Sequence, residues 1–216
     1  METVEKQNNP KWTIIGWTII FSLGYAILRY HIAGPVPWKD FPFFILNKGI
    51  SLSAFILLTF NFSFGPLKNL GLPIPNSWLR SRRLIGIAGF ILAFIHMIMS
   101  FMLFNPANYG KFFVENGTMT LISGLSMLAG VISFIFLWLY NVSFNSEFRK
   151  DKDLIEFITS RKVLLTAMFL GGAHLIIMGY KGWLNPGGWH GGLPPISLVA
   201  ATFFIVGYIV NIFGRE

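Results

Sequence analysis

The chain has 216 residues, of which 54% are hydrophobic and 12% are charged, and its formal net charge is +8. Soluble domains carry about twice this share of charged residues, so the composition indicates an integral membrane protein. The absence of cysteine excludes disulfides, thiolate metal sites and Cys-ligated iron–sulfur clusters. Because the basic residues occupy short segments between apolar runs, the positive charge indicates membrane orientation and not nucleic-acid binding.

Six apolar runs follow one another along the chain, and each is long enough to cross a bilayer, which takes about 20 residues. The first run lacks a small-residue cleavage site, so we expect a retained anchor and not a signal peptide. The sequence predicts an all-α membrane protein, with an N-terminal tail (1–11) followed by a six-transmembrane-helix bundle (12–216). The expected spans are Trp12–Tyr30, Phe43–Phe64, Leu84–Phe104, Thr118–Tyr140, Val163–Tyr180 and Leu193–Phe213.

Most of the 17 Lys and Arg residues lie on one side of this topology, namely the two termini and the second and fourth loops. Cytoplasmic loops are enriched in these residues, so we expect both termini to be cytoplasmic, in a bacterial-type inner or plasma membrane. Within the fourth loop, Glu147–Phe157 is expected to form a short amphipathic surface helix. The segment Gly182–Pro195 is expected to be an external loop. The residues assigned to the cytoplasmic side are Lys6, Lys11, Lys68, Arg80, Arg82, Arg83, Arg149, Lys150, Lys152, Arg161, Lys162 and Arg215.

Two histidines are expected at membrane depth, where ionisable residues are costly and usually functional. His96 follows Arg83 by thirteen residues, and His174 follows Arg161 by thirteen. The third and fifth spans run in the same direction, so both imidazoles are expected about 20 Å from the cytoplasmic boundary. Two neutral imidazoles at one level can ligate haem iron from both sides, which favours electron transfer. The alternative is that each histidine only hydrogen-bonds a neighbouring helix.

The residues around the histidines suit a tetrapyrrole. Gly89 and Gly171 lie on the expected histidine faces, where small residues let a flat macrocycle approach, although they are equally typical of helix-packing notches. Lys48, near the outer end of the second span, either snorkels to the surface or pairs with a haem propionate. Several large apolar residues are expected to line the slot, namely Phe90, Phe94, Phe101, Met97, Met168 and Met178.

Other polar residues have two interpretations each. Positive-inside anchoring alone is enough to explain Arg83 and Arg161, together with Arg82. The functional alternative is that they form a cationic rim that docks an acidic reductase or a flavin phosphate. His190, in Gly-Gly-Trp-His-Gly-Gly, and His31 are expected to be loop anchors, and His190 has the further alternative of contacting a haem edge or an external acceptor.

An ordered set of motifs resembles the ferric reductase-like transmembrane domain superfamily, from the second to the fifth span. The set comprises Gly65-Pro66-Leu67-Lys68, Arg82-Arg83-Leu84-Ile85-Gly86, His96, Ser160-Arg161-Lys162 and His174. The superfamily includes NADPH oxidases, single-haem six-transmembrane ferrireductases and the haem-binding subunit of the methionine sulfoxide reductase system. The resemblance implies that His96 and His174 are haem ligands. The inner histidine pair of NADPH oxidases is replaced by Arg83 and Arg161, so the resemblance implies one haem.

The expected function is therefore that of a b-type haem oxidoreductase. Electrons would pass from a cytoplasmic-side donor, a soluble flavin reductase or a membrane quinol, through haem b to an external redox partner or acceptor such as ferric iron or oxygen. The long distance from the cytoplasmic boundary predicts an intermediate carrier, FMN/FAD or quinone. The alternatives are a non-enzymatic scaffold or transporter, and a haem anchor subunit for a separate catalytic protein.

Overall fold

The structure is a computed structural model that describes residues 10–143 and 150–214. Over these residues the regular secondary structure is helical, and the connections contain one isolated antiparallel bridge, between Phe113 and Met119. Six of the described helices, counted with the turns that continue them, are long and apolar enough to cross a membrane. The prediction of an all-α chain with six helices able to span a membrane is confirmed over these residues. The spans are Pro10–Ile32, Trp38–Asn69, Asn76–Leu103, Leu121–Val142, Arg161–Trp183 and His190–Phe213.

Each span is built around one long α-helix. These helices are α1 (Pro10–Ile27), α2 (Leu46–Asn69), α3 (Asn76–Leu103), α5 (Leu121–Val142), α7 (Arg161–Trp183) and α8 (Ile196–Phe213). Two short helices, α4 (Pro106–Tyr109) and α6 (Lys152–Thr159), lie in the connections. The π-helical turn Leu28–Ile32 continues α1, and Phe41–Ile45 precedes α2. Short 3-10 turns cover Trp38–Asp40, Gly110–Phe112, Pro186–Gly188 and His190–Gly192.

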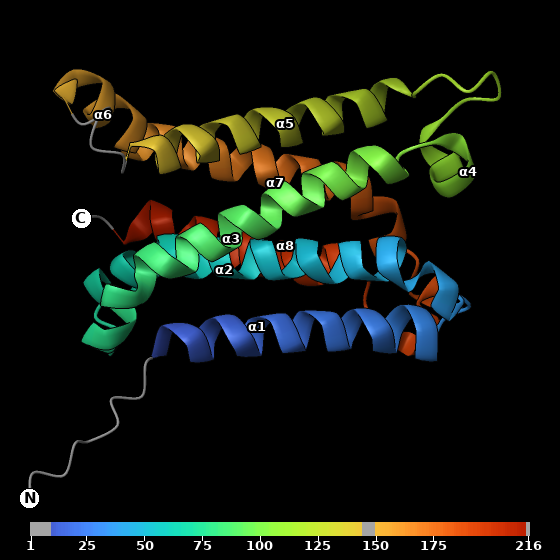
Figure 1. Cartoon of the computed structure of the whole chain (residues 1–216), viewed down its shortest axis with the longest axis horizontal. Helices are drawn as coiled ribbons and strands as arrows, with labels where there is room; N and C mark the ends of the chain where they lie inside the picture. The colour runs from blue at the N-terminus through green and yellow to red at the C-terminus, as the bar shows by residue number, and fades with distance from the viewer. Residues whose placement is uncertain (1–9, 144–149, 215–216) are drawn as a thin grey trace, which may run out of the picture.

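Successive long helices run in opposite directions, so the bundle has two distinct ends (Figure 1). At one end α1 begins, α8 ends and α6 lies across the surface; we call this the terminal end. The opposite, distal end carries α4 and the connections from α1 to α2 and from α7 to α8. Helix α1 therefore begins on the side of the bundle where helix α8 ends.

Helix α2 is the central helix, since it packs against α1, α3 and α8 and is the most buried of the spans. Glycines allow the close approach of its neighbours. A Cβ added to Gly89 of α3 would lie 3.0 Å from Leu58 Cγ of α2, and one added to Gly207 of α8 would lie 2.6 Å from Thr59 Cγ2. Small residues at helix crossings are the usual means of tight packing where no water drives association.

Helices α5 and α7 form the second tight pair, and α5 contacts α3 only lightly. The face of α5 toward α7 carries small residues at intervals of three and four, namely Ser123, Ser126, Gly130 and Ser133. The hydroxyl of Ser133 donates a hydrogen bond of 2.8 Å to the carbonyl oxygen of Ala167. Such stripes let two backbones approach while the serines satisfy their own polar groups on the neighbouring helix.

Two helix ends extend furthest beyond the expected spans. The second span continues through Pro66 to Asn69, and the third begins at Asn76, eight residues before the expected Leu84. A tertiary contact accounts for the earlier start of α3. Arg82 Nε donates a hydrogen bond of 2.9 Å to the carbonyl oxygen of Asn61, which fastens the polar start of α3 to α2. An apolar-run criterion cannot detect such a polar first turn.

The fourth connection contains α6, whose first turn is capped by the Asp151 side chain accepting from the Leu154 amide. Helix α6 covers the second part of the surface helix predicted at Glu147–Phe157, and it exposes Phe157 while burying Ile158. Glu147 itself lies outside the described residues. The same holds for Lys6, Arg149 and Arg215, on which the orientation prediction partly depended, and for residues 1–9 of the expected tail.

Candidate functional site: a histidine-lined cavity

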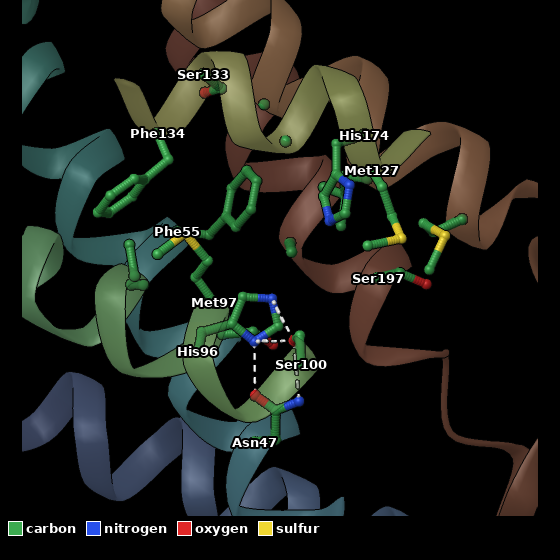
Figure 2. Close-up of a pocket in the computed structure, with 18 of the residues that line it drawn as sticks. Asn47, Phe55, His96, Met97, Ser100, Met127, Ser133, Phe134, His174 and Ser197 are labelled. Carbon is green, nitrogen blue, oxygen red and sulfur yellow. Dashed lines mark hydrogen bonds between the residues drawn. The ribbon is translucent and has the colours of Figure 1, made fainter. Parts of the chain in front are cut away.

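His96 of α3 and His174 of α7 line the same cavity, which has a volume of about 270 Å³. The cavity lies in the distal half of the bundle, and its walls come mainly from α2, α3, α5 and α7. Both imidazole rings point into the space between these helices (Figure 2). The structure therefore brings together two residues that are 78 positions apart in the sequence.

The ring of His174 is held by α5. Its Nδ1 atom lies 2.9 Å from the carbonyl oxygen of Ser126 and 3.2 Å from the Ser126 hydroxyl oxygen. That hydroxyl donates to the carbonyl oxygen of His174 at 2.9 Å. Because a carbonyl oxygen can only accept, Nδ1 carries the ring proton of the neutral imidazole. The Nε2 atom is then the one with the free lone pair.

The ring of His96 is held by α2. Its Nδ1 atom lies 2.7 Å from Asn47 Oδ1, and Asn47 Nδ2 donates to the Ser100 hydroxyl at 3.2 Å (Figure 2). The amide oxygen can only accept, so here too Nδ1 is the donor. The Ser100 oxygen also lies 3.3 Å from Nδ1 and 3.5 Å from Nε2, and the second distance is too long for a strong hydrogen bond. The Nε2 lone pair of His96 is thus also left for another partner.

This pattern is that of metal-ligating histidines, which donate the proton of one ring nitrogen to a protein oxygen and present the other nitrogen to the metal. The backbone oxygen of Ser126 and the amide of Asn47 fix both tautomers and both ring orientations. In both residues Nε2 is therefore the ring nitrogen left for a ligand in the cavity that they share.

Of the two glycines predicted beside the histidines, Gly171 lines the cavity and Gly89 does not. Gly89 packs against α2, as described above, so it serves as a packing notch. The glycine closest to a histidine is Gly130 of α5, where an added Cβ would lie 2.9 Å from His174 Nδ1. The sequence analysis did not single out Gly130, because its proximity to His174 depends on how α5 and α7 are rotated.

Lys48 is the cationic residue of the cavity wall. Its ammonium lies 5.4 Å from the ring centre of Phe44 and 5.3 Å from that of Tyr109, within the range of cation–π contacts. Neither the cavity lining nor any described contact supplies a carboxylate partner for Lys48. The positive charge is therefore placed to receive an anionic group of a bound molecule.

The rest of the lining is mostly apolar. Met97, Phe101 and Met178 line the cavity as predicted, but Phe90, Phe94 and Met168 do not. Phe90 and Phe94 instead stack on Phe134, with ring centres 5.2 and 5.9 Å apart. The aromatic face of α3 is thus used to contact α5, and the methionines remain as the deformable part of the wall.

Arg83 and Arg161 lie at the terminal end and do not line the histidine cavity. Arg161 Nη2 donates to the carbonyl oxygens of Asn211 and Ile212 at 2.8 and 2.6 Å. It caps the last turn of α8, where carbonyls lack partners within the helix. Arg83 lines a second cavity together with Arg80 and Arg82.

The two remaining histidines lie in the distal connections. The ring of His190 packs edge-on against Tyr30, with centres 6.4 Å apart, and Tyr30 in turn lines the cavity. One aromatic ring therefore separates His190 from the cavity. His31 Nδ1 lies 2.9 Å from the carbonyl oxygen of Val36, and its ring packs on Trp38 at 5.0 Å. Both residues anchor loops.

Comparison of the chain with protein-family models and with curated proteins gives no match. The resemblance to the ferric reductase-like superfamily therefore depends on the motifs of this sequence.

The donor set of the cavity fits a haem better than a bare metal ion. The described residues contain no group of three or more His, Cys, Asp or Glu that would hold a metal by itself. A haem would need two nitrogen ligands from the protein, and His96 and His174 are the residues that would supply them. At about 270 Å³ the cavity is slightly smaller than typical small-molecule sites. Because Met97, Met127 and Met178 have flexible side chains, the wall can widen around a macrocycle.

Proposed function

We propose that the chain is a single-haem, b-type membrane cytochrome of the ferric reductase-like kind, which passes electrons across the bilayer. The observation that carries this proposal is the pairing of His96 and His174 in one cavity, each with Nδ1 bound to a protein oxygen. A haem held by two histidines supplies reversible one-electron chemistry between ferric and ferrous iron. Saturating both axial positions favours electron transfer over oxygen binding at the iron.

Each polar residue of the wall has a role in this proposal. Asn47 and Ser126 hold the imidazole rings in orientation and keep their protons on Nδ1. Lys48 pairs with a carboxylate of the porphyrin, because among the described residues of the lining it is the one Lys or Arg and no carboxylate lies beside it. The apolar remainder of the wall excludes water. Gly171 leaves the surface of α7 flat beside His174.

The direction of electron flow follows from the charge distribution. The terminal end carries Lys68, Arg82, Arg83 and Lys162, and by the positive-inside rule these charges support a cytoplasmic position for that end. The donor is then a soluble flavin reductase or a membrane quinol, with a flavin or quinone as the intermediate carrier. The acceptor is an external redox partner at the distal end. Whether the chain acts alone as a reductase or as the haem subunit of a larger enzyme is decided by its partners.

Absorption spectroscopy of the purified protein tests the proposal. We expect a Soret band, with α and β bands that sharpen on reduction by dithionite. His96→Ala and His174→Ala should each abolish the low-spin spectrum, while His31→Ala and His190→Ala should preserve it, because those rings lie outside the cavity. A spectrum that survives both core substitutions, or a protein purified from haem-replete cells without a Soret band, would favour the non-enzymatic scaffold or transporter.

An activity assay distinguishes a haem anchor subunit from a stand-alone reductase. With haem bound in both cases, only a reductase oxidises a supplied quinol or reduced flavin with ferric iron as acceptor. An anchor subunit would show the same spectrum and no turnover until a second protein is added. Co-purification of an external partner at the distal end would identify that case.

A further inference from the structure

Three lysines from separate parts of the chain lie together on the distal side of the histidine cavity. Lys48, near the start of α2, lines the cavity. Lys111 lies in the turn Gly110–Phe112 that follows α4, and Lys181 lies in the last turn of α7. Lys181 follows His174 by seven residues, which is two helical turns. It therefore lies on the same face of α7, about 10 Å further toward the distal end.

A continuous set of contacts joins Lys48 to Lys111. The Lys48 ammonium lies 5.3 Å from the ring centre of Tyr109, which also lines the cavity. The Tyr109 ring stacks on that of Phe112, with centres 6.1 Å apart, and the Lys111 ammonium lies 4.7 Å from the ring centre of Phe112. Partial desolvation lowers the pKa of Lys111, and the positive charges of Lys48 and Lys181 lower it further. The three ammonium groups are thus close enough to repel one another.

This positive charge has no carboxylate beside it among the described residues of the cavity wall. None of those residues is acidic, and the two charges that lower the pKa of Lys111 are both positive. In the proposed orientation the distal end is external, where lysines are not needed as topology signals. Like charges held together raise the free energy of the fold unless an anion balances them. The three lysines are therefore suited to a ligand that carries more than one negative group.

The end of the cavity away from these lysines is apolar. Leu58 of α2 lines it ten residues after Lys48, which is about 15 Å toward the terminal end. Leu137 of α5 lines it at the same end, since both leucines also border the cavity that lies at the terminal end. The hydroxyl of Ser133 is already bonded to the carbonyl oxygen of Ala167. The histidine cavity is thus cationic at its distal end and apolar at the other, as suits a molecule with its carboxylates on one edge.

We infer that haem is held with its carboxylate edge toward the distal end, with Lys48 and Lys111 as the partners of its two carboxylates. This inference rests on the proposed cytochrome function and adds the direction in which the porphyrin faces. Hydrogen bonds between ammonium and carboxylate groups are among the strong ones in proteins. Lys181 adds to the positive potential without a contact of its own. The apolar edge of the porphyrin then lies against Leu58 and Leu137.

Soret titration of the full-length protein, purified from haem-depleted cells, tests the inference with two porphyrins. These are haem b and its dimethyl ester, in which both carboxylates are blocked. Lys111→Gln should weaken binding of haem b about tenfold and leave binding of the ester unchanged, because only haem b offers a carboxylate to the ammonium. Lys39→Gln is the matched control, since it removes an exposed cation at the same end of the bundle outside the cavity. It should leave both dissociation constants unchanged.

Amine labelling with acetic anhydride, read by mass spectrometry, gives a second measurement that needs no variant. A carboxylate favours the protonated, unreactive form of a neighbouring ammonium, so haem b should protect Lys111 from labelling. The dimethyl ester should not protect it. Succinate, a free dicarboxylate, is the third probe and should not protect it either.

Three results would overturn the inference while leaving the cytochrome proposal in place. The first is equal behaviour of Lys111→Gln and Lys39→Gln in the haem b titration. The second is equal affinity of the unsubstituted protein for haem b and for its dimethyl ester. The third is protection of Lys111 by succinate as complete as that by haem b, because the lysines would then form a site for free anions. Failure of the unsubstituted protein to bind either porphyrin would instead overturn the cytochrome proposal, and this inference with it.

Discussion

The Nδ1 atom of His174 donates a hydrogen bond of 2.9 Å to the backbone carbonyl oxygen of Ser126. This bond joins α7 to α5 inside the bundle and decides which nitrogen of His174 is available to a ligand. Because the acceptor belongs to the backbone, side-chain substitution cannot remove it, and the orientation of the ring is built into the packing of the two helices.

Replacing Asn47 should weaken haem binding without removing either ligand. Asn47→Leu keeps the volume of the side chain and deletes the oxygen that accepts from His96 Nδ1 at 2.7 Å. Loss of such an orienting partner costs about 10- to 100-fold in affinity for a metal centre. The measurement is the dissociation constant for haem by Soret titration. Ser51→Ala on the same helix, which changes a cavity residue not bonded to His96, should leave the constant unchanged.

Adding one methyl group beside His174 should disturb its ligation. Gly130→Ala places a Cβ 2.9 Å from Nδ1 and 3.1 Å from Cγ of the ring, closer than real Cβ contacts allow, so the ring has to move. We expect the low-spin α and β bands to weaken or shift in the reduced spectrum. The matched control is Gly124→Ala on the same helix. It raises the helix propensity by the same amount, but its added Cβ lies no closer than 3.8 Å to its nearest neighbour, Met119 Sδ. Equal spectra for the two variants would contradict the observed position of the ring.

Removing the cation of the cavity should lower haem retention. Lys48→Met keeps a long apolar side chain and deletes the charge proposed to pair with a porphyrin carboxylate. A charge-assisted hydrogen bond of this kind is worth about 2 kcal/mol, or roughly a 30-fold change in the dissociation constant. Lys48→Arg should retain most of the affinity. Lys39→Met, an exposed cation at the same end of the bundle, is the control, and an equal effect there would rule out a specific role for Lys48.

Arg161 should prove to be a structural residue. Arg161→Ala removes the donor to the carbonyl oxygens of Asn211 and Ile212. The free energy of unfolding should fall by only about 1 kcal/mol, because these two hydrogen bonds are partly exposed to solvent. The test is the melting temperature in detergent, with Lys162→Ala as the neighbouring control. The haem spectrum should be unchanged. A large loss of reduction rate without loss of stability would instead support the docking role considered for this residue.

The surroundings of the histidines illustrate what sequence patterns miss. Ser100 lies four residues after His96 and was within reach of a helical-periodicity argument, but Ser126 and Gly130 lie on another helix, 48 and 44 positions before His174. Gly89 and Gly171 were equivalent as sequence features. In the structure Gly89 packs against Leu58 on α2 and lies outside the cavity, whereas Gly171 lines the cavity and also lies close to α5, where an added Cβ would be 3.1 Å from Ser133 Oγ.

The sequence by itself determined the six spans, since the length of an apolar run and the rise of a helix are local properties. It also placed His96 and His174 at matching positions along parallel helices, because equal residue counts from a basic boundary mean equal rise. The rotation of each helix about its axis and the choice of neighbours were decided only by the tertiary structure. Packing of small residues on α5 against α7, and of Gly89 and Gly207 against α2, sets those rotations. That packing alone brings Asn47 to His96, Ser126 to His174 and the arginines of α3 to Asn61.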